Sequence, residues 1–511
     1  MKNNVKAFAV SLVALVSLCA CSQTKYAEET DEAIINQLEV VNREDGVYGN
    51  IHLPTEIEGA TVTWKSADKK VIDAQGDEQK APGIVYRQAE DKTVKLTAII
   101  DKDGTKTQYE QEVLVKAAPQ EIKDEDYKAY LFGHFVGESY GTTKNGQKVA
   151  TGEQMFFALA DVGQGLKFKD MNGSKMNSLK PVLSSDVGER GVRDPFICRS
   201  PEGDSFYLIA TDLSVYTRGG WGNNNGTNKF TITGSHSITL WESHDLVNWT
   251  DARLIEVAAP NAGMAWAPEM IYSEETGEYV IFFSSTIIED KAIHERDCIY
   301  YTTTRDFVHF GETKKFIKNQ PYPEGKEDPR KSSDSPKAIN NNERKIIDAS
   351  VMKIGDWYYS ACKDGDNHED GGILIQKTQN LFDIDSWQKV LDLDELGFKS
   401  PWSYQLNGAS KTALTNNCLE GPEWFYLNQA DRKDANVPEI GLMADFYADT
   451  SKGYMPFTTT NIEDANNSQN SWRQLKSGTD YSWDAQTKRH GTILRITEEE
   501  ANRLKEAYPI A

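Results

Sequence analysis

The sequence predicts an all-β protein in which a small β-sandwich precedes a five-bladed β-propeller. Short apolar runs separated by turn residues recur along most of the 511 residues. Tyr and Phe, which strands favour, number 22 and 19. A helical period of 3.6 residues is found only near "EEEANRLKEAY" at the C-terminus. With 39% hydrophobic residues, the chain can bury more than one core.

The first 21 residues have the pattern of an export signal. "MKNNVKAFAVSLVALVSLCAC" has a short basic start, an apolar run too short to span a bilayer comfortably, and small residues before a cysteine. It resembles a bacterial lipoprotein signal in which cleavage after Ala20 leaves Cys21 to carry the lipid. An ordinary secretory signal is the alternative. We therefore expect an exported protein, lipid-anchored at the cell envelope in the outer membrane or periplasm of a Gram-negative bacterium.

Residues 30–118 are predicted to form the β-sandwich. "ATVTWKSADKKVIDAQG" alternates between apolar and polar residues and then turns. "TVKLTAIIDKDGTKTQYEQEVLVKA" gives two alternating runs around an Asp-Gly turn, which is a strong hairpin signal. The pieces "VTWKS" and "VKLTAII" resemble a bacterial immunoglobulin-like domain. Such domains act as spacers or packing partners, so we expect a structural role.

A diverged repeat covers residues 125–511. Five apolar strands each carry a polar residue: "RDPFICR" (Asp194), "WAPEMIYS" (Glu269), "IDASVMKI" (Asp348), "LEGPEWFYL" (Glu420) and "RHGTILRIT" (His490). The separations of 75, 79, 72 and 70 residues are nearly equal, which indicates one structural unit used five times. Strands rich in Tyr and Phe follow several of them. This pattern predicts five blades.

The last of these strands lies almost at the C-terminus, so its blade must be completed from elsewhere. "AYLFGHFV", "EQMFFALAD" and "LKFKDMN" precede the first unit and can supply the missing strands. The first strand of each propeller blade lines the central channel. The polar residues of five separate strands are therefore expected to converge in one pocket.

The ordered motifs "RDP", "WAPE", "IDAS", "EGP" and "RHG" resemble glycoside hydrolase family 43 over residues 125–511. The resemblance implies hydrolysis with inversion, with Asp194 as general base, Glu420 as general acid and Asp348 as the residue that tunes the pKa of the acid. Inversion needs one ionised carboxylate to activate water and one protonated carboxyl group at the leaving oxygen. We expect nearby negative charge or burial to raise the pKa of the acid.

Other residues are candidates for binding rather than catalysis. Glu269 is expected to bind a sugar hydroxyl or line the channel, and Arg489 to contact substrate. Sugars stack on aromatic rings, so Trp221, Trp266 and Trp402 are candidate stacking platforms, with packing as the alternative for each. The resemblance also implies a calcium ion held through water near His490, although a lone histidine is more often packed or hydrogen-bonded.

No cofactor is expected for the reaction. The four cysteines beyond the signal are far apart without a Cys-x-x-Cys motif, so free thiols are expected rather than a zinc site. A formal charge of −22 argues against nucleic acid as a partner. The expected partner is an oligo- or polysaccharide.

The resemblance favours an exo-acting enzyme that releases terminal furanosyl units, above all α-L-arabinofuranose, from plant polysaccharide side chains. The alternatives are a β-D-galactofuranosidase or exo-galactanase of the same family, and a non-catalytic glycan-binding propeller. A retaining fructan hydrolase ranks low, because residues 125–190 contain no "NDP"-type motif for its nucleophile.

Overall fold

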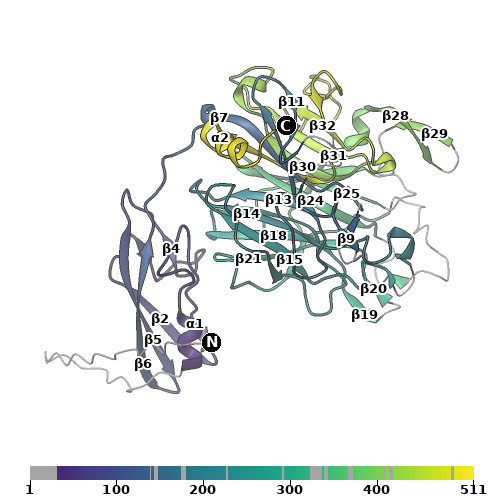
Figure 1. Cartoon of the computed structure of the whole chain (residues 1–511). Coiled ribbons are helices and arrows are strands. Elements are labelled where there is room, and N and C mark those ends of the chain that lie inside the picture. The colour runs from purple at the N-terminus through teal and green to yellow at the C-terminus, as the bar shows by residue number, and fades with distance from the viewer. Residues whose placement is uncertain are drawn as a thin grey trace.

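The computed structural model describes most of the chain beyond residue 31. The described ranges are 32–138, 140–142, 148–173, 180–225, 228–290, 293–322, 337–338, 343–365, 372–406, 409–413, 418–484 and 488–510. The predicted lipidation site, Cys21, lies outside them. Strands dominate, as the sequence predicts, and an extended segment links a small N-terminal part to a larger part built of sheets (Figure 1).

The N-terminal part contains one four-stranded antiparallel sheet in the order β1-β2-β5-β6. The strands are β1 (Glu56–Ile57), β2 (Ala60–Ser66), β5 (Lys92–Lys102) and β6 (Thr105–Val115), beside the pair β3 (Ile72–Asp73) and β4 (Ile84–Val85). Asp103 and Gly104 both have positive φ, which suits the tight turn predicted between β5 and β6. The helix α1 (Glu32–Leu38) differs from the strand-and-turn pattern expected there.

The described residues of the larger part form five four-stranded sheets. The strands of each sheet pair antiparallel with their neighbours, and the first strand given for each sheet is the one that carries a predicted motif. They are β13 (Val192–Arg199), β14 (Phe206–Asp212), β15 (Ser237–Ser243) and β16 (Arg253–Glu256); β17 (Trp266–Ser273), β18 (Glu278–Ser285), β21 (Cys298–Thr304) and β22 (Lys314–Ile317); β24 (Ile346–Ile354), β25 (Trp357–Asp364), β26 (Ile373–Thr378) and β27 (Gln388–Asp392); β30 (Glu420–Tyr426), β31 (Ile440–Asp445), β32 (Tyr454–Thr459) and β33 (Trp472–Gln474); and β35 (Gly491–Thr497), β7 (Tyr127–His134), β10 (Phe156–Asp161) and β12 (Lys169–Asp170).

The five motif-bearing strands contact one another in a cyclic order. β13 contacts β17, β17 contacts β24, β24 contacts β30, β30 contacts β35, and β35 contacts β13 again. The fifth sheet joins the two ends of the larger part, because β35 pairs with β7 in the register Gly491↔His134 to Ile496↔Ala129. The early strands therefore complete the last sheet, as predicted. The helix α2 (Glu498–Ala507), capped by Thr497, follows directly in the segment with helical periodicity.

A repeated backbone kink shapes the start of four of these strands. Asp194, Ala267, Asp348 and Gly421 have φ between +45° and +54°, and the strand register shifts at the same place in each sheet. Such a bulge re-aims the side chains around it. The equivalent positions are therefore these four, so Glu269 lies two residues beyond the kink and is not the counterpart of Asp194.

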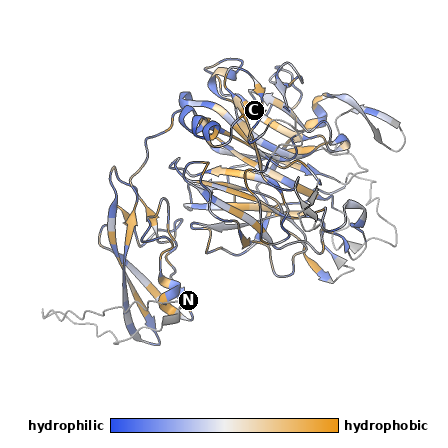
Figure 2. Ribbon diagram, viewed as in Figure 1, coloured by the Kyte–Doolittle hydropathy of each residue, from blue (hydrophilic) through white to orange (hydrophobic). Residues whose placement is uncertain are grey.

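Apolar residues form nearly continuous buried runs along the middle strands of the larger part and pack between its sheets (Figure 2). The described residues of the larger part also form smaller sheets. The two-stranded ones are β8 (Tyr140–Thr142) with β9 (Lys148–Ala150), β11 (Leu166–Lys167) with β34 (Tyr481–Ser482), and β28 (Lys399–Leu406) with β29 (Ala409–Ala413), and one three-stranded sheet has the order β19 (Ile288–Asp290), β20 (Ile293–His294) and β23 (Lys337–Ala338). The four body cysteines are free thiols, as expected. In the described part of the chain, every helix is too short or too polar to cross a bilayer.

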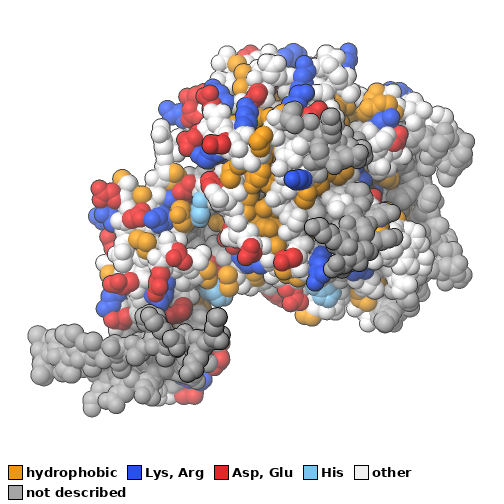
Figure 3. Space-filling view, viewed as in Figure 1, with side chains coloured by type: hydrophobic (Ala, Val, Ile, Leu, Met, Phe, Trp, Pro, Cys, Tyr) orange, Lys and Arg blue, Asp and Glu red, His pale blue; other side chains and the backbone are white. Residues whose placement is uncertain are grey.

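Polar contacts hold the N-terminal part against the sheets. The Arg87 guanidinium binds both carboxylate oxygens of Asp204 at 2.7 and 2.8 Å. Arg305 donates to the carbonyl oxygens of Ala81 and Pro82. Histidine side chains lie along this seam (Figure 3), where His244 stacks on Tyr48. The contacts fit the packing role expected for this part.

Candidate active site

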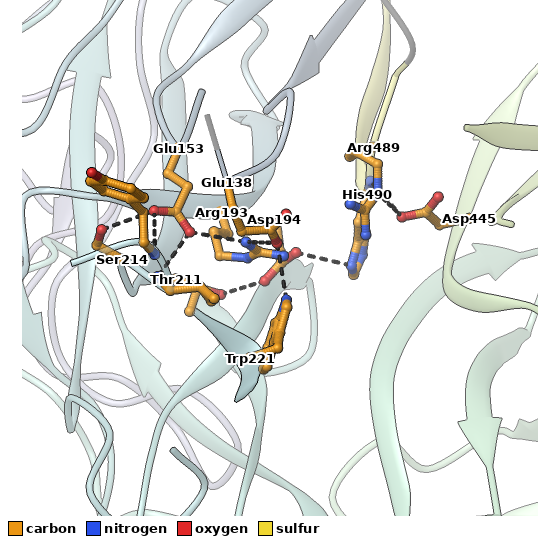
Figure 4. Close-up of polar contacts among 12 residues, drawn as sticks. Glu138, Glu153, Arg193, Asp194, Thr211, Ser214, Trp221, Asp445, Arg489 and His490 are labelled. Atoms are coloured by element: carbon orange, nitrogen blue, oxygen red, sulfur yellow. Dashed lines mark hydrogen bonds and ion pairs between the residues drawn. The ribbon is translucent and has the colours of Figure 1, made fainter. Parts of the chain in front are cut away.

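Asp194 lies at the kink of β13 and has two partners. Thr211 Oγ1 donates to its Oδ2 at 3.0 Å, and Nδ1 of His490 lies 3.4 Å from its Oδ1 (Figure 4). Burial alone would raise the pKa of Asp194. The hydrogen bond and positive charge of His490, with the charge of Arg193, outweigh burial and lower the pKa overall. Asp194 is therefore held as a carboxylate, the state that a general base needs.

Asp348 occupies the same kink in β24, two sheets away. Its backbone N–H donates to Ser284 Oγ at 2.9 Å, and its Oδ2 accepts from the backbone N–H of Gly421 at 3.2 Å. Burial and the negative charge of Glu420 raise the pKa of Asp348 to about 6, although His490 acts in the opposite direction. Asp348 thus exchanges its proton closer to neutral pH than an ordinary aspartate.

Glu420 begins β30 and contacts two cations. Lys363 Nζ donates to its Oε2 at 2.9 Å, and Arg489 lies 3.9 Å from its Oε1. Burial would raise the pKa of Glu420, but Lys363 and Arg489 lower it overall. The sequence predicts the opposite direction for a general acid. The pKa of Glu420 is lowered rather than raised because Lys363, which the sequence analysis did not place beside Glu420, stabilises its ionised form.

The structure brings the three predicted carboxyl groups together although they come from three different sheets. Asp348 is influenced electrostatically by both Asp194 and Glu420. His490 acts on all three, and burial, which would lower its pKa, is outweighed by the hydrogen bond to Asp194 and by nearby carboxylates, so its pKa rises to about 9. The imidazole is therefore a cation at neutral pH. The three carboxyl groups and the cationic imidazole of His490 therefore act on one another within a single site.

Arg489 and Asp445 form the wall on one side of this region. Arg489 Nε donates to Asp445 Oδ2 at 2.8 Å (Figure 4). Asp445 pairs across the strands with Glu420. The side chains of Arg489 and Asp445 are both buried. The predicted contact of Arg489 with substrate stays a prediction, while within the protein Arg489 binds Asp445 and lies 3.9 Å from Glu420.

Glu269 lies in a layer below the kinks, next to Glu423. The two carboxyl groups are 4% and 2% exposed, so neither can be reached directly by a substrate. Burial, followed by the charge of Glu423, raises the pKa of Glu269 well above its usual range, and burial raises that of Glu423 to about 7. The geometry favours the channel-lining alternative for Glu269 over a sugar ligand.

The three predicted tryptophans lie in different surroundings. Trp221 is 45% exposed, and its Nε1 donates to Glu138 Oε1, which also binds Arg193 at 2.7 Å beside Asp194 (Figure 4). Trp266 packs on a small cluster with Phe230. The ring of Trp402 lies 5.5 Å from that of Phe446. Contacts of these rings with sugar stay predictions, and Trp221 is the one with an exposed face near Asp194.

Sequence reasoning missed Lys363, Thr211 and Asp445. Each is a polar residue near the end of the second strand of its sheet, within "WYYSACKD", "FYLIATD" and "IGLMAD". The signal was available, because an ionisable or polar side chain closing an apolar strand is the same anomaly that marks Asp194. Arg193, the neighbour of Asp194 in sequence, binds Glu138 and Glu153.

Comparison with known families supports the pattern of motifs. A family model described as a probable glycosyl hydrolase domain, related to glycoside hydrolase family 43, matches residues 125–502. The chain belongs to this family. A second model, for an atrophied bacterial Ig domain, matches residues 27–118. Both resemblances predicted from the sequence are thereby confirmed for this family 43-related chain.

One curated relative is an alpha-L-arabinofuranosidase from Bifidobacterium longum subsp. longum. It is 32% identical over 443 residues, which are 79% of this chain and 36% of the relative. The chain thus spans about a third of that protein's length. Similar solved structures include an alpha-L-arabinanase of Penicillium chrysogenum, with 13% identity, coverage of 74% and 87% of the two chains and a TM-score of 0.37. An endo-1,4-beta-xylanase of Bacteroides thetaiotaomicron has 10% identity, coverage of 70% and 99%, and a TM-score of 0.37.

Proposed function

We propose that this protein is an α-L-arabinofuranosidase that removes terminal α-L-arabinofuranosyl units from plant polysaccharide side chains with inversion. Membership of the family and the 32% identity to an alpha-L-arabinofuranosidase support the reaction class and the sugar. The observation that carries the proposal is the grouping of Asp194, Asp348 and Glu420, from three sheets, around His490.

Asp194 acts as the general base in this proposal. An inverting enzyme places a water molecule between the base and the anomeric carbon. His490 and Thr211 keep Asp194 ionised and fix its two oxygens, so the carboxylate can accept a proton from that water as it attacks. The low pKa of Asp194 supports this role over that of proton donor.

Glu420 acts as the general acid and protonates the departing glycosidic oxygen. Asp348 lies beside it, and a negative charge on Asp348 favours the protonated form of Glu420. Arg489 holds the opposite side of the Glu420 carboxyl group. Trp221 offers an exposed indole face on the side of Asp194 for stacking against the sugar ring.

The architecture of the proposal follows the sequence prediction. Residues 125–511 form a five-bladed β-propeller whose inner strands are β13, β17, β24, β30 and β35, and the cyclic contacts of these strands support it. Residues 30–118 form an immunoglobulin-like domain with a packing role. Residues 1–21 form a lipoprotein signal that exports the protein and leaves Cys21 lipidated at the cell envelope.

A calcium ion near His490 stays a prediction, and no catalytic step is assigned to it. Within the described residues, no group of three or more His, Cys, Asp or Glu side chains is arranged to hold a metal ion. His490 carries a positive charge at neutral pH and already faces Asp194, so it is a poor neighbour for a second cation.

Hydrolysis of nitrophenyl glycosides tests the proposal. The panel contains the α-L-arabinofuranoside, the β-D-galactofuranoside, the β-D-xyloside and the β-D-galactoside, with wild type and Glu420→Gln measured in parallel. We expect the arabinofuranoside to give the highest kcat/KM. Glu420→Gln is expected to lose at least about 100-fold on an arabino-oligosaccharide, whose leaving alcohol needs a proton, and less on nitrophenyl glycosides, whose nitrophenolate leaves without one. Preference for the galactofuranoside would replace the sugar assignment, and no hydrolysis by wild type would favour a glycan-binding role.

A further inference from the structure

Lys363 is the cation in closest contact with the predicted general acid. It lies near the end of β25, in the sheet that precedes the one carrying Glu420, and its Nζ donates to Glu420 Oε2 at 2.9 Å. The pairing Ile347↔Lys363 sets it beside the residue that precedes Asp348. The contact therefore links a side chain of one sheet to the reacting group of the next.

The surroundings of Lys363 leave its ammonium group little freedom. The side chain is only 6% exposed, and the Nζ lies 4.1 Å from the centre of the Tyr447 ring, in cation–π geometry. Arg489, another cation near Glu420, is farther away at 3.9 Å and is already engaged by Asp445 at 2.8 Å. A buried ammonium group needs a charged partner, and Glu420 provides it.

This contact conflicts with the chemistry required of Glu420. A general acid must carry a proton when the glycosidic oxygen arrives, yet a carboxylate that accepts a hydrogen bond from an ammonium group is stabilised in its ionised form. Resting on the proposed function, we propose that Lys363 is a positioning residue: it holds the Glu420 carboxylate in place in the free enzyme and releases it when the carboxyl group takes up the proton used in catalysis.

The charges around Glu420 allow such a release. Glu420 interacts electrostatically with five charged or titratable groups: Lys363 from β25, Asp348 from β24, Asp445 from β31, and Arg489 and His490 from the segment before β35. Asp348 lies in the field of the same ammonium group, and its pKa is raised to about 6, so it is partly protonated at mildly acidic pH. A proton leaving Asp348 as Glu420 gains one keeps the total charge constant, so Lys363 retains an anionic neighbour in both states.

Three variants separate charge from packing. Lys363→Met removes the ammonium group and keeps much of the stem, while Lys363→Arg keeps the charge. Lys377→Met is the matched control, because Lys377 also binds a glutamate, Glu463, at 2.6 Å and lies 4.4 Å from an aromatic ring, that of Trp357. Near-UV circular dichroism establishes that each variant is folded.

The first measurement is the titration of Glu420 itself, followed by carbon-13 NMR of protein labelled at glutamate carboxyl carbons. Glu420→Gln identifies the resonance. We expect the Glu420 midpoint to rise by about one to three pH units in Lys363→Met, the range for a carboxylate that loses an adjacent cation. Lys363→Arg and Lys377→Met are expected to keep the wild-type midpoint. An unchanged midpoint in Lys363→Met, or an equal rise in Lys377→Met, would overturn the proposal.

The second measurement is the pH profile of kcat/KM on an arabino-oligosaccharide, whose leaving alcohol must be protonated, so that the basic limb reports the general acid of the free enzyme. We expect the basic limb to move to higher pH in Lys363→Met and to stay in place in Lys363→Arg. A shifted Glu420 titration with an unmoved basic limb overturns the positioning role. If wild type cleaves no glycoside, the proposed function fails. The effect of Lys363 on the ionisation of Glu420 is still tested by the NMR titration in that case.

Discussion

The ion pair between His490 and Asp194 makes the stability of the protein depend on pH. The substitution His490→Gln removes the ion pair and with it this pH-dependent contribution. The pKa of His490 rises from 6.5 to about 9, because the hydrogen bond and charge of Asp194 outweigh burial, which acts in the opposite direction. A group with a raised pKa in the folded state contributes its full stability below the unfolded pKa and loses it as the pH rises through the folded value. The difference corresponds to about 3 kcal/mol.

Urea unfolding, followed by tryptophan fluorescence at pH 6 and pH 10, measures this contribution. We expect His490→Gln to be less stable than wild type at pH 6, and the gap to narrow by about 3 kcal/mol at pH 10. His244→Gln is the control, since His244 stacks on Tyr48 at the seam and its Nδ1 lies 3.0 Å from the backbone oxygen of Asp204. A gap for His490→Gln that is the same at both pH values would refute the ion pair.

Two further predictions concern the neighbours of the site. Burial, with the charge of Glu423, raises the pKa of Glu269, so the contribution of Glu269 to stability is lost as the pH rises through the folded value. In the same unfolding assay, Glu269→Gln should therefore gain stability relative to wild type between pH 5 and pH 9. A difference in unfolding free energy that is the same at both pH values would contradict this. Thr211→Val removes the hydrogen bond to Asp194 and should lower kcat/KM about tenfold and move the acid limb to higher pH. Thr239→Val, at a buried hydroxyl without a hydrogen-bond partner, should leave both unchanged.

The sequence predicts the sheets and two of the carboxyl positions well. Asp194 and Asp348 stand at the same kink, and their motifs are recognisable because a charged residue interrupts an apolar strand. The completion of the last sheet by β7 follows from counting strands. These features depend on the local pattern of polar and apolar residues and on the order of the strands along the chain, and both can be read directly from a sequence.

The register of Glu269 was not predicted, because the motifs were aligned on their acidic residues rather than on their backbone. A proline follows three of the four kinks, in Asp194-Pro195, Ala267-Pro268 and Gly421-Pro422, and marks the equivalent positions, while Ala349 follows the fourth kink at Asp348. The contact of Lys363 with Glu420 could not be predicted from the sequence for a different reason. It joins side chains 57 residues apart on neighbouring sheets, and only the packing of those sheets brings them together.

Proton NMR of the first sugar released from the α-L-arabinofuranoside tests the central claim most directly. The claim is that Asp194 activates water while Glu420 protonates the leaving oxygen on the opposite side of the sugar. Direct attack by water inverts the anomeric centre, so the account predicts β-L-arabinofuranose as the first product, before mutarotation. First appearance of the α-anomer would contradict the account, because retention requires a covalent intermediate on one of these carboxyl groups.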